Sequence, residues 1–226
     1  MPEGYRTMRP GSGDPVLALL ARGLELWLRQ QCDSIEDLQI RLEGNTVQLL
    51  RGQLRSVRLQ ARGVVFQQLE IERVELCSDP LQVRMGALLR SQGLQLQHPF
   101  RIMGSVAFSA EGLSRSLARP QWSQLADALA EELLGLSPLA GLRFEGERLI
   151  LRSLVMNDGQ PLERGTMVDI EDGGLLLRAV PGPADDLDPA TEASEARLPR
   201  DPGIHFERAE VGGGLLELHG TARVAP

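Results

Sequence analysis

The chain contains no lysine, so all 24 of its basic residues are arginines. A genome-wide codon bias explains such a complete absence more simply than a requirement for planar guanidinium groups. Aromatic residues are also scarce, at 4% of 226 residues, whereas hydrophobic residues make up 42%. The apolar content is therefore mostly aliphatic, which suits the packing of a core and also contact with acyl chains. The length allows one large domain or two small ones.

Long hydrophobic runs are absent as well. The best run, from Val16 to Ala21, is followed at once by Arg22. A membrane-spanning helix needs about 20 consecutive apolar residues. The first residues carry little positive charge and no convincing cleavage site, so we predict no signal peptide. These absences predict a protein that is cytoplasmic or peripheral to a membrane.

Motifs of enzymes and metal sites are missing too. Cys32 and Cys77 are far apart and have no CxxC spacing, so they do not suggest a zinc site. The three histidines, His98, His205 and His219, belong to no HExxH motif, and the chain has no GxSxG motif. We therefore predict a protein that is not an enzyme and has neither a metal site nor a cofactor.

Charge is distributed unevenly along the chain, whose net charge is −7. Residues 41–120 hold eleven arginines against six acidic residues, whereas residues 121–226 hold nine against nineteen. Such asymmetry favours an anionic partner at the basic part, although solvated faces alone could produce it. The four arginines between residues 51 and 62 have no interleaved aromatic residues for base stacking, and the isoelectric point is about 5.1. We therefore predict no nucleic-acid partner.

Two amphipathic helices are predicted. Asp14 as N-cap and Pro15 at the first helical position begin a helix that runs to about Gln31. Its apolar stripe is wide, so the helix either packs against a core or contacts lipid at a membrane surface. The second helix runs from Trp122 to Leu136, because its apolar residues recur at helical spacing.

The segment 57–76 alternates apolar and polar residues as a half-buried strand does, but its phase changes. Leu69 and Ile71 share one parity, whereas Val74 and Leu76 fall on the other. A one-residue slip turns later side chains to the opposite face unless a bulge absorbs the extra residue. We therefore predict two strands with a bend at Gly63 and a bulge between Ile71 and Val74, which would curl the sheet.

A second long alternating stretch runs from Leu94 to Phe108, which is long for a strand. The chain is divided into a flexible tail (1–13), a lipid-binding-like α+β domain (14–180), an acidic disordered loop (181–203) and a hairpin that completes the same domain (204–226). The loop is predicted from its prolines and acidic residues and its lack of large apolar groups.

These patterns predict an α+β fold in which a long, curved, mostly antiparallel sheet wraps one or two amphipathic helices. A curved sheet of this kind leaves an apolar groove, and apolar grooves take lipid-like ligands. The predicted groove lining is Val57, Leu59, Leu69, Ile71, Val74, Leu94, Leu96, Phe100, Ile102, Val106 and Phe108, and the candidates for headgroup contact are Arg51 and Arg55.

About half of the chain, from Pro15 to Leu117, resembles the LmeA family of bacterial phospholipid-binding proteins. The segment Leu49-Leu50-Arg51-Gly52 matches the entry to a strand in that family, and the helix start at 109–114 keeps its Glu and Leu. The resemblance implies a fold related to tubular lipid-binding proteins, with a phospholipid partner whose acyl chains lie in an apolar cleft. Contact with a membrane surface is compatible with it. The segments that carry the resemblance are 16–31, 34–76 and 83–117.

An alternative function remains open. The chain could be a scaffold or interaction module with a fully packed core, whose partner docks on the acidic C-terminal half. Both hypotheses need the same strands, but only lipid binding needs an open apolar volume of about 300 Å³. If the helix at 122–136 filled the strand faces, the scaffold would be favoured.

Overall fold

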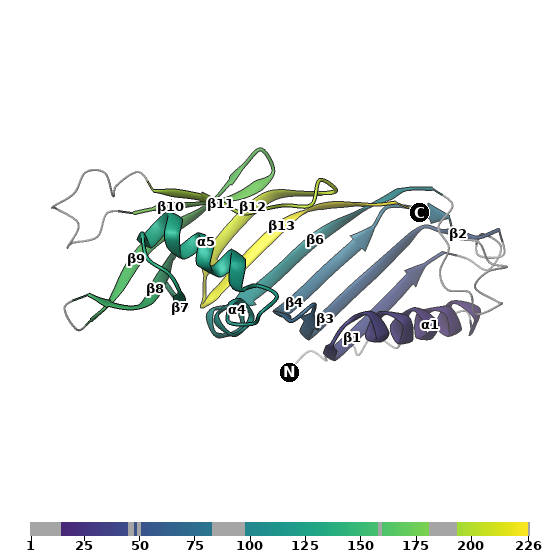
Figure 1. Ribbon diagram of the computed structural model, residues 1–226. Helices are drawn as coiled ribbons and strands as arrows, with labels where there is room; N and C mark the ends of the chain where they lie inside the picture. The colour runs from purple at the N-terminus through teal and green to yellow at the C-terminus, as the bar shows by residue number, and fades with distance from the viewer. Residues whose placement is uncertain are drawn as a thin grey trace, which may run out of the picture.

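The computed structural model describes residues 15–44, 48, 51–82, 98–157, 160–180 and 194–225. They form an elongated α+β structure in which two antiparallel sheets follow one another along the long axis (Figure 1). The predicted α+β class with a large antiparallel sheet is confirmed. The helices of the described part are α1 (Pro15–Gln31), α4 (Ala110–Leu117) and α5 (Ser123–Leu134).

The larger sheet has six strands, which come from both halves of the chain. The long strand predicted from Leu94 begins at Phe100 in the structure, and Leu94 and Leu96 lie outside the described residues. The order across the sheet is β1 (Ser34–Glu43), β3 (Ser56–Phe66), β4 (Leu69–Ser78), β6 (Phe100–Ser109), β13 (Leu215–Val224) and β12 (Ile204–Gly212).

The second sheet is formed by the segment between β6 and β12. Its order is β11 (Glu195–Arg197), β10 (Gly174–Ala179), β9 (Gln160–Glu171), β8 (Arg148–Asn157) and β7 (Leu139–Glu145). A separate pair, β2 (Gln53–Leu54) and β5 (Leu81–Gln82), lies at the opposite end of the larger sheet, near α1 (Figure 1).

Part of the segment predicted to be an acidic disordered loop is instead a strand. β11 pairs with β10, and its central residue, Ala196, is fully buried opposite Leu177. The prediction was wrong here because a strand of three residues has too little alternation to stand out from its acidic surroundings. The tail 1–13 and residues 181–193 lie outside the described part.

The change of phase seen in the sequence occurs in neighbouring strands at the same height. Ala61 and Val64 are three residues apart, yet both belong to one buried cluster, together with Val74 of β4. The register is the same on both sides of this point: Ala61 pairs with Val74, and Val64 pairs with Ile71. The apolar side chains therefore stay on one face although the alternation slips.

The predicted bulge between Ile71 and Val74 is wrong, because no strand here carries an extra residue relative to its neighbour. The strands slip together, and Gly63 adopts a positive φ of 56° at the point of change. A Cβ on Gly63 would lie 2.4 Å from Cδ of Glu36 on β1, so a side chain would not fit. A register shift does occur in β12, between Phe206 and Arg208. This irregularity lets Phe206 and Ala209, three residues apart, both face the apolar side.

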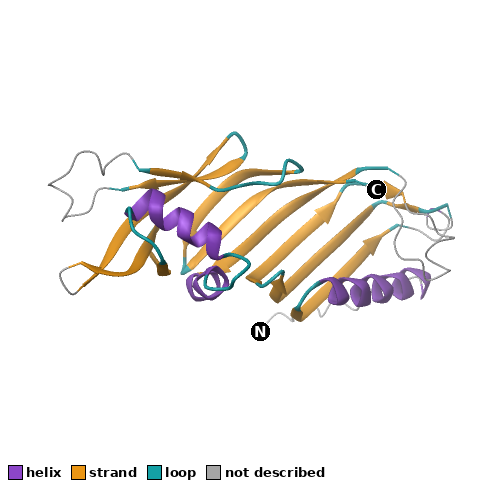
Figure 2. Cartoon of the chain, in the orientation of Figure 1, coloured by secondary structure: helices purple, strands orange, loops and turns teal. Residues whose placement is uncertain are grey.

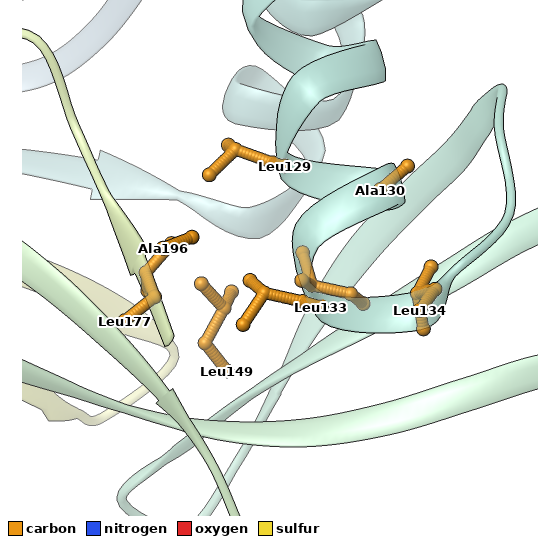
Figure 3. Close-up of a cluster of buried hydrophobic side chains, with 8 residues drawn as sticks. Leu129, Ala130, Leu133, Leu134, Leu149, Leu177 and Ala196 are labelled. Carbon is orange, nitrogen blue, oxygen red and sulfur yellow. The ribbon is translucent and has the colours of Figure 1, made fainter. Parts of the chain in front are cut away.

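The main core of the second sheet lies under α5 (Figure 3). Leu129, Ala130 and Leu133 of α5 pack against Leu149 of β8 and Leu177 of β10. The C-cap of α5, Gly135, has a φ of 68°, which ends the helix in the left-handed conformation. The helix that we predicted at 122–136 is therefore committed to the second sheet.

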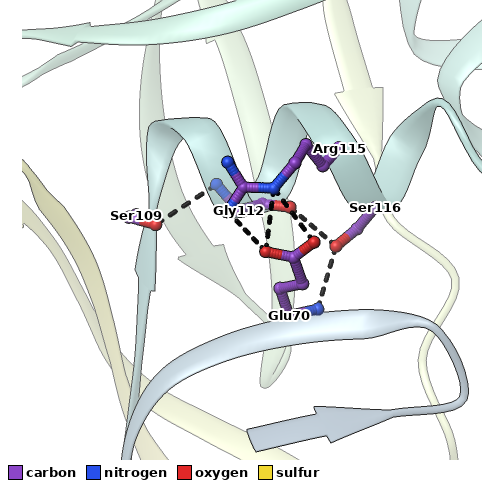
Figure 4. Close-up of polar contacts among 5 residues, drawn as sticks. All are labelled: Glu70, Ser109, Gly112, Arg115 and Ser116. Carbon is purple, nitrogen blue, oxygen red and sulfur yellow. Dashed lines mark hydrogen bonds and ion pairs between the residues drawn. The ribbon is translucent and has the colours of Figure 1, made fainter. Parts of the chain in front are cut away.

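Helix α4 connects the two sheets through buried hydroxyl groups. The Ser116 hydroxyl accepts a hydrogen bond from the Glu70 backbone N–H of β4 at 2.9 Å and donates one to the Gly112 carbonyl at 2.7 Å (Figure 4). The Ser114 hydroxyl donates to the Leu142 carbonyl of β7 at 3.1 Å and accepts from the Leu142 N–H at 2.9 Å. One short helix therefore holds both sheets.

An ion pair lies above these bonds. The Arg115 guanidinium donates to both carboxylate oxygens of Glu70, at 2.6 Å and 3.1 Å for its closest contacts (Figure 4). These hydrogen bonds lower the pKa of the Glu70 carboxyl from its ordinary value. Ser109 caps the helix by accepting a hydrogen bond from the Gly112 N–H.

The Ser116→Ala variant should lower the free energy of unfolding by about 1–3 kcal/mol, because it leaves the buried Glu70 N–H without a partner. Urea denaturation measures the change. Ser123→Ala is the control, because the Ser123 hydroxyl is exposed and bonds only to the Pro120 carboxyl-side oxygen of its own turn. Equal stability of the two variants would show that α4 is not held to β4 in this way.

Candidate lipid-binding face

The six-stranded sheet has one aliphatic face. Because paired residues in an antiparallel sheet point to the same side, the register assigns side chains to rows that cross the strands. The first row is Leu38, Ala61, Val74, Val106, Leu218 and Ala209; the second is Ile40, Leu59, Leu76, Gly104, Gly220 and Phe206; the third includes Leu42, Val57, Ile102, Ala222 and Ile204.

The opposite face is polar. Arg62, Arg73 and Glu217 belong to one of its rows, and Arg73 pairs with Glu217 at 2.9 Å. Gln60 and Glu75 face each other in the next row. An antiparallel sheet with one wet face and one apolar face normally buries the apolar one against another layer.

That second layer is incomplete over the middle of the larger sheet. In the first row Leu38, Ala61, Val74 and Leu218 are buried, but Leu59 and Leu76 in the second row are only half-buried. Among the described helices, α1 lies beside β1, whereas α4 and α5 lie at the other end (Figure 2). No described helix covers the centre of β3, β4 and β6, so this part of the aliphatic face is open.

The face is closed at one end by the second sheet. Phe108, Leu216 and Val211 form a buried cluster with which Phe144 of β7 and Val168 of β9 make contact. The apolar surface is therefore continuous from one sheet to the other, with α4 beside the junction.

The other end of the face contains a cavity of about 290 Å³. Leu54 of β2 and Leu81 of β5 are buried beneath it, and Val57 and Phe100 pack against them. Arg55 and the side chains of Gln48, Gln53 and Gln82 are among its lining residues, together with Pro80. An apolar base with amide and guanidinium groups around it can hold a ligand that has one apolar and one anionic part.

Most of the predicted groove-lining residues meet in these clusters. Leu59, Ile71, Val74 and Val106 share one cluster, and Val57 and Phe100 share the cluster beside the cavity. Leu69 and Phe108 lie at the junction with the second sheet, and Ile102 belongs to the third row. Of the two headgroup candidates, Arg55 lines the cavity, whereas Arg51 is exposed in the turn that precedes it and is not among the lining residues.

The sequence prediction missed contributions from strands distant in the chain. Leu38, Ile40 and Leu42 of β1 lie on the same face, and so do Leu218 and Phe206 of the C-terminal hairpin. Their alternation marked them as half-buried strands. Only the order of strands in the sheet, which alternation does not determine, places them beside β3 and β6.

Reactive groups do not gather in the described part of the chain, which contains no group of three or more residues suited to a metal ion. Burial, and to a smaller extent the nearby Asp33 carboxylate, raises the pKa of the Cys32 thiol, which keeps it protonated. His219 lies 3.5 Å from the Glu217 carboxylate, while His98 and His205 are exposed elsewhere. Of the helices described, none is long and apolar enough to cross a membrane.

The fold and this face define the class of the protein: an α+β protein whose antiparallel sheet leaves one aliphatic face partly uncovered. The LmeA-like phospholipid-binding family matches residues 12–221, and the chain belongs to this family. The predicted resemblance is therefore confirmed, and it extends over the second sheet as well. No curated protein and no solved structure matches the chain.

Two paired glycines lie in the second row of the face, where Gly104 of β6 stands opposite Gly220 of β13. A Cβ on Gly104 would lie 1.9 Å from the Glu75 carbonyl oxygen, so β4 and β6 can approach this closely only because the side chain is absent. The row between Leu76 and Phe206 therefore has no side chains at its centre.

Gly104→Ala should lower the free energy of unfolding by about 1–3 kcal/mol, as overpacking between two backbones does. Gly212→Ala in the same sheet is the control, because nothing lies within 4 Å of the position of its Cβ. Thermal melts would compare the two variants. A wild-type melting temperature for Gly104→Ala would contradict the close approach of the strands.

Proposed function

We propose that the protein binds a phospholipid with its acyl chains along the open aliphatic face of the six-stranded sheet. The observation that carries this proposal is the incomplete cover of the second row, where Leu59 and Leu76 remain half-buried although they are aliphatic. An acyl chain laid on these side chains removes apolar surface of both partners from water, and each buried methylene contributes about 0.8 kcal/mol.

The headgroup lies, in this proposal, at the cavity beside β2 and β5. Arg55 supplies a permanent positive charge there, and Gln53 and Gln82 supply amide donors. Phosphate oxygens accept hydrogen bonds from such groups, and the arginine bonds are strengthened by charge. Arg51, four residues earlier, adds positive charge near the entrance without lining the cavity. The proposed action is binding, without catalysis, and it requires no cofactor.

The position of α5 favours lipid binding over the scaffold alternative. A fully packed scaffold requires a layer over the strand faces of the larger sheet, and α5 was the candidate for that layer. Leu129, Leu133 and Leu134 of α5 pack instead on the second sheet. The cavity of about 290 Å³ also has the size expected of a small ligand pocket.

A double variant on the face tests the acyl-chain part of the proposal. Leu59→Gln with Leu76→Gln should weaken binding of a fluorescent phospholipid by about tenfold, because two half-buried apolar contacts are replaced by amides. Gln60→Ala with Glu75→Ala is the control, since these neighbouring residues point to the polar face. The proposal fails if organic extraction of the purified protein yields no lipid and if both double variants bind like the wild type.

The headgroup part has a separate test. Arg55→Gln should weaken binding of an anionic phospholipid by about tenfold, as loss of one charge-assisted contact does, and should affect a lysolipid alcohol without phosphate much less. Arg101→Gln on β6 is the matched control, because Arg101 is exposed and pairs with Asp79 away from the cavity. Equal loss with both ligands would place the headgroup elsewhere.

A further inference from the structure

Helix α1 is attached to the sheet by one side only. Leu17 and Leu20 pack towards the cluster beside the cavity, and Leu28 packs against the cluster of the first row. None of the described side chains of this helix is fully buried. A 17-residue helix of a globular core usually buries part of its apolar stripe completely.

The side of α1 that points away from the sheet also carries large apolar residues. Leu26 is 64% exposed and Trp27 is 41% exposed. Leu26 lies two positions after Leu24, so it cannot join the inner stripe of Leu20, Leu24 and Leu28. Exposed leucine and tryptophan together are typical of helices that lie in the interface of a bilayer.

The charges around this apolar pair are mostly positive. Arg22 and Arg29 stand four residues before and three residues after Leu26, on the same side of the helix. Glu25 is paired with Arg29 at 3.4 Å. The protein as a whole has a net charge of −7, so an anionic surface repels it except where arginines predominate. This contrast selects one orientation on a negatively charged surface.

The helix is also close to the proposed entry for the ligand. Leu17 and Leu20 pack against Leu54 and Leu81, which form the apolar base of the cavity beside Arg55. Leu28 packs on the aliphatic side of the sheet, so the outer side of α1 faces the same way as the open strands.

We propose that α1 docks the protein on the surface of an anionic phospholipid bilayer, with Leu26 and Trp27 inserted among the headgroups. Docking in this orientation brings the cavity at β2 and β5 to the membrane surface, where a phospholipid can enter. This inference rests on the proposed function for its purpose. The docking surface itself is defined by α1 alone.

The test compares two exposed apolar pairs at opposite ends of the molecule. Leu26→Gln with Trp27→Gln changes the proposed docking surface. Leu154→Gln with Val155→Gln is the control, because these residues of β8 are 63% and 40% exposed. Sedimentation with vesicles of phosphatidylcholine and phosphatidylglycerol measures docking, and the α1 variant should lose about tenfold or more in partition while the control stays at the wild-type value. Vesicles of phosphatidylcholine alone should bind the wild type more weakly.

A second readout separates docking from lipid binding. A short-chain phosphatidylglycerol below its micelle concentration is monomeric, so its binding does not need a membrane surface. The α1 variant should bind it like the wild type. If the wild type does not bind this monomer but docks through α1, the proposed function fails and the docking inference stands. If it binds the monomer and neither variant changes sedimentation, the docking inference is overturned and the function stands.

The two tryptophans of the chain provide a direct measurement of insertion. The Trp122 indole donates a hydrogen bond to the Gln67 carbonyl at 2.9 Å, so it is fixed to the protein. In a Trp122→Phe variant, the remaining Trp27 should shift its emission to the blue on vesicles and be quenched by brominated acyl chains. An unchanged emission would overturn the proposal. So would a loss of self-association in the α1 variant without vesicles, since a second copy would then be the partner of this surface.

Discussion

The arrangement of the two sheets depends on the hydroxyl groups of α4. Ser116 is completely buried and satisfies a backbone N–H of β4, while Ser114 bonds both backbone groups of Leu142 in β7. A buried donor without a partner is costly, so the helix cannot move from either sheet without losing these bonds. The continuity of the aliphatic surface follows, because Phe108 and Phe144 meet only while the sheets keep this relative position.

The larger sheet keeps its apolar side chains on one face by two different devices. Adjacent strands slip in phase together near Gly63, and β12 has an irregularity of register near Phe206. Both devices add local twist, and the pair Gly104 and Gly220 allows the backbones to approach closely. A sheet that curls in this way gathers its aliphatic residues towards a common axis while its other face stays in water.

Periodicity in the sequence predicted the elements better than their neighbours. The helical spacing after Trp122 located α5, and the alternation after Phe100 located β6, because both signals are long. The slip at Ile71 was recognised, but its cause was assigned to a bulge, since one strand read alone cannot reveal that its neighbours slip at the same height. β11 was missed because three residues carry no period. The resemblance to a phospholipid-binding family, by contrast, depended on segments of the first half and holds for nearly the whole chain.

The pairing of β6 with β13 joins residues that are far apart in the chain. Phe100 faces Val224, and everything from α4 to β12 lies between these strands in sequence. On the ribosome, β6 therefore has an unpaired edge until β13 has been made, although β4 is already available on its other side. An unpaired edge that also carries aliphatic side chains is prone to wrong pairing, and non-local contacts of this kind form slowly. The same closure that completes the ligand-facing sheet thus makes it the last part of the molecule to be assembled.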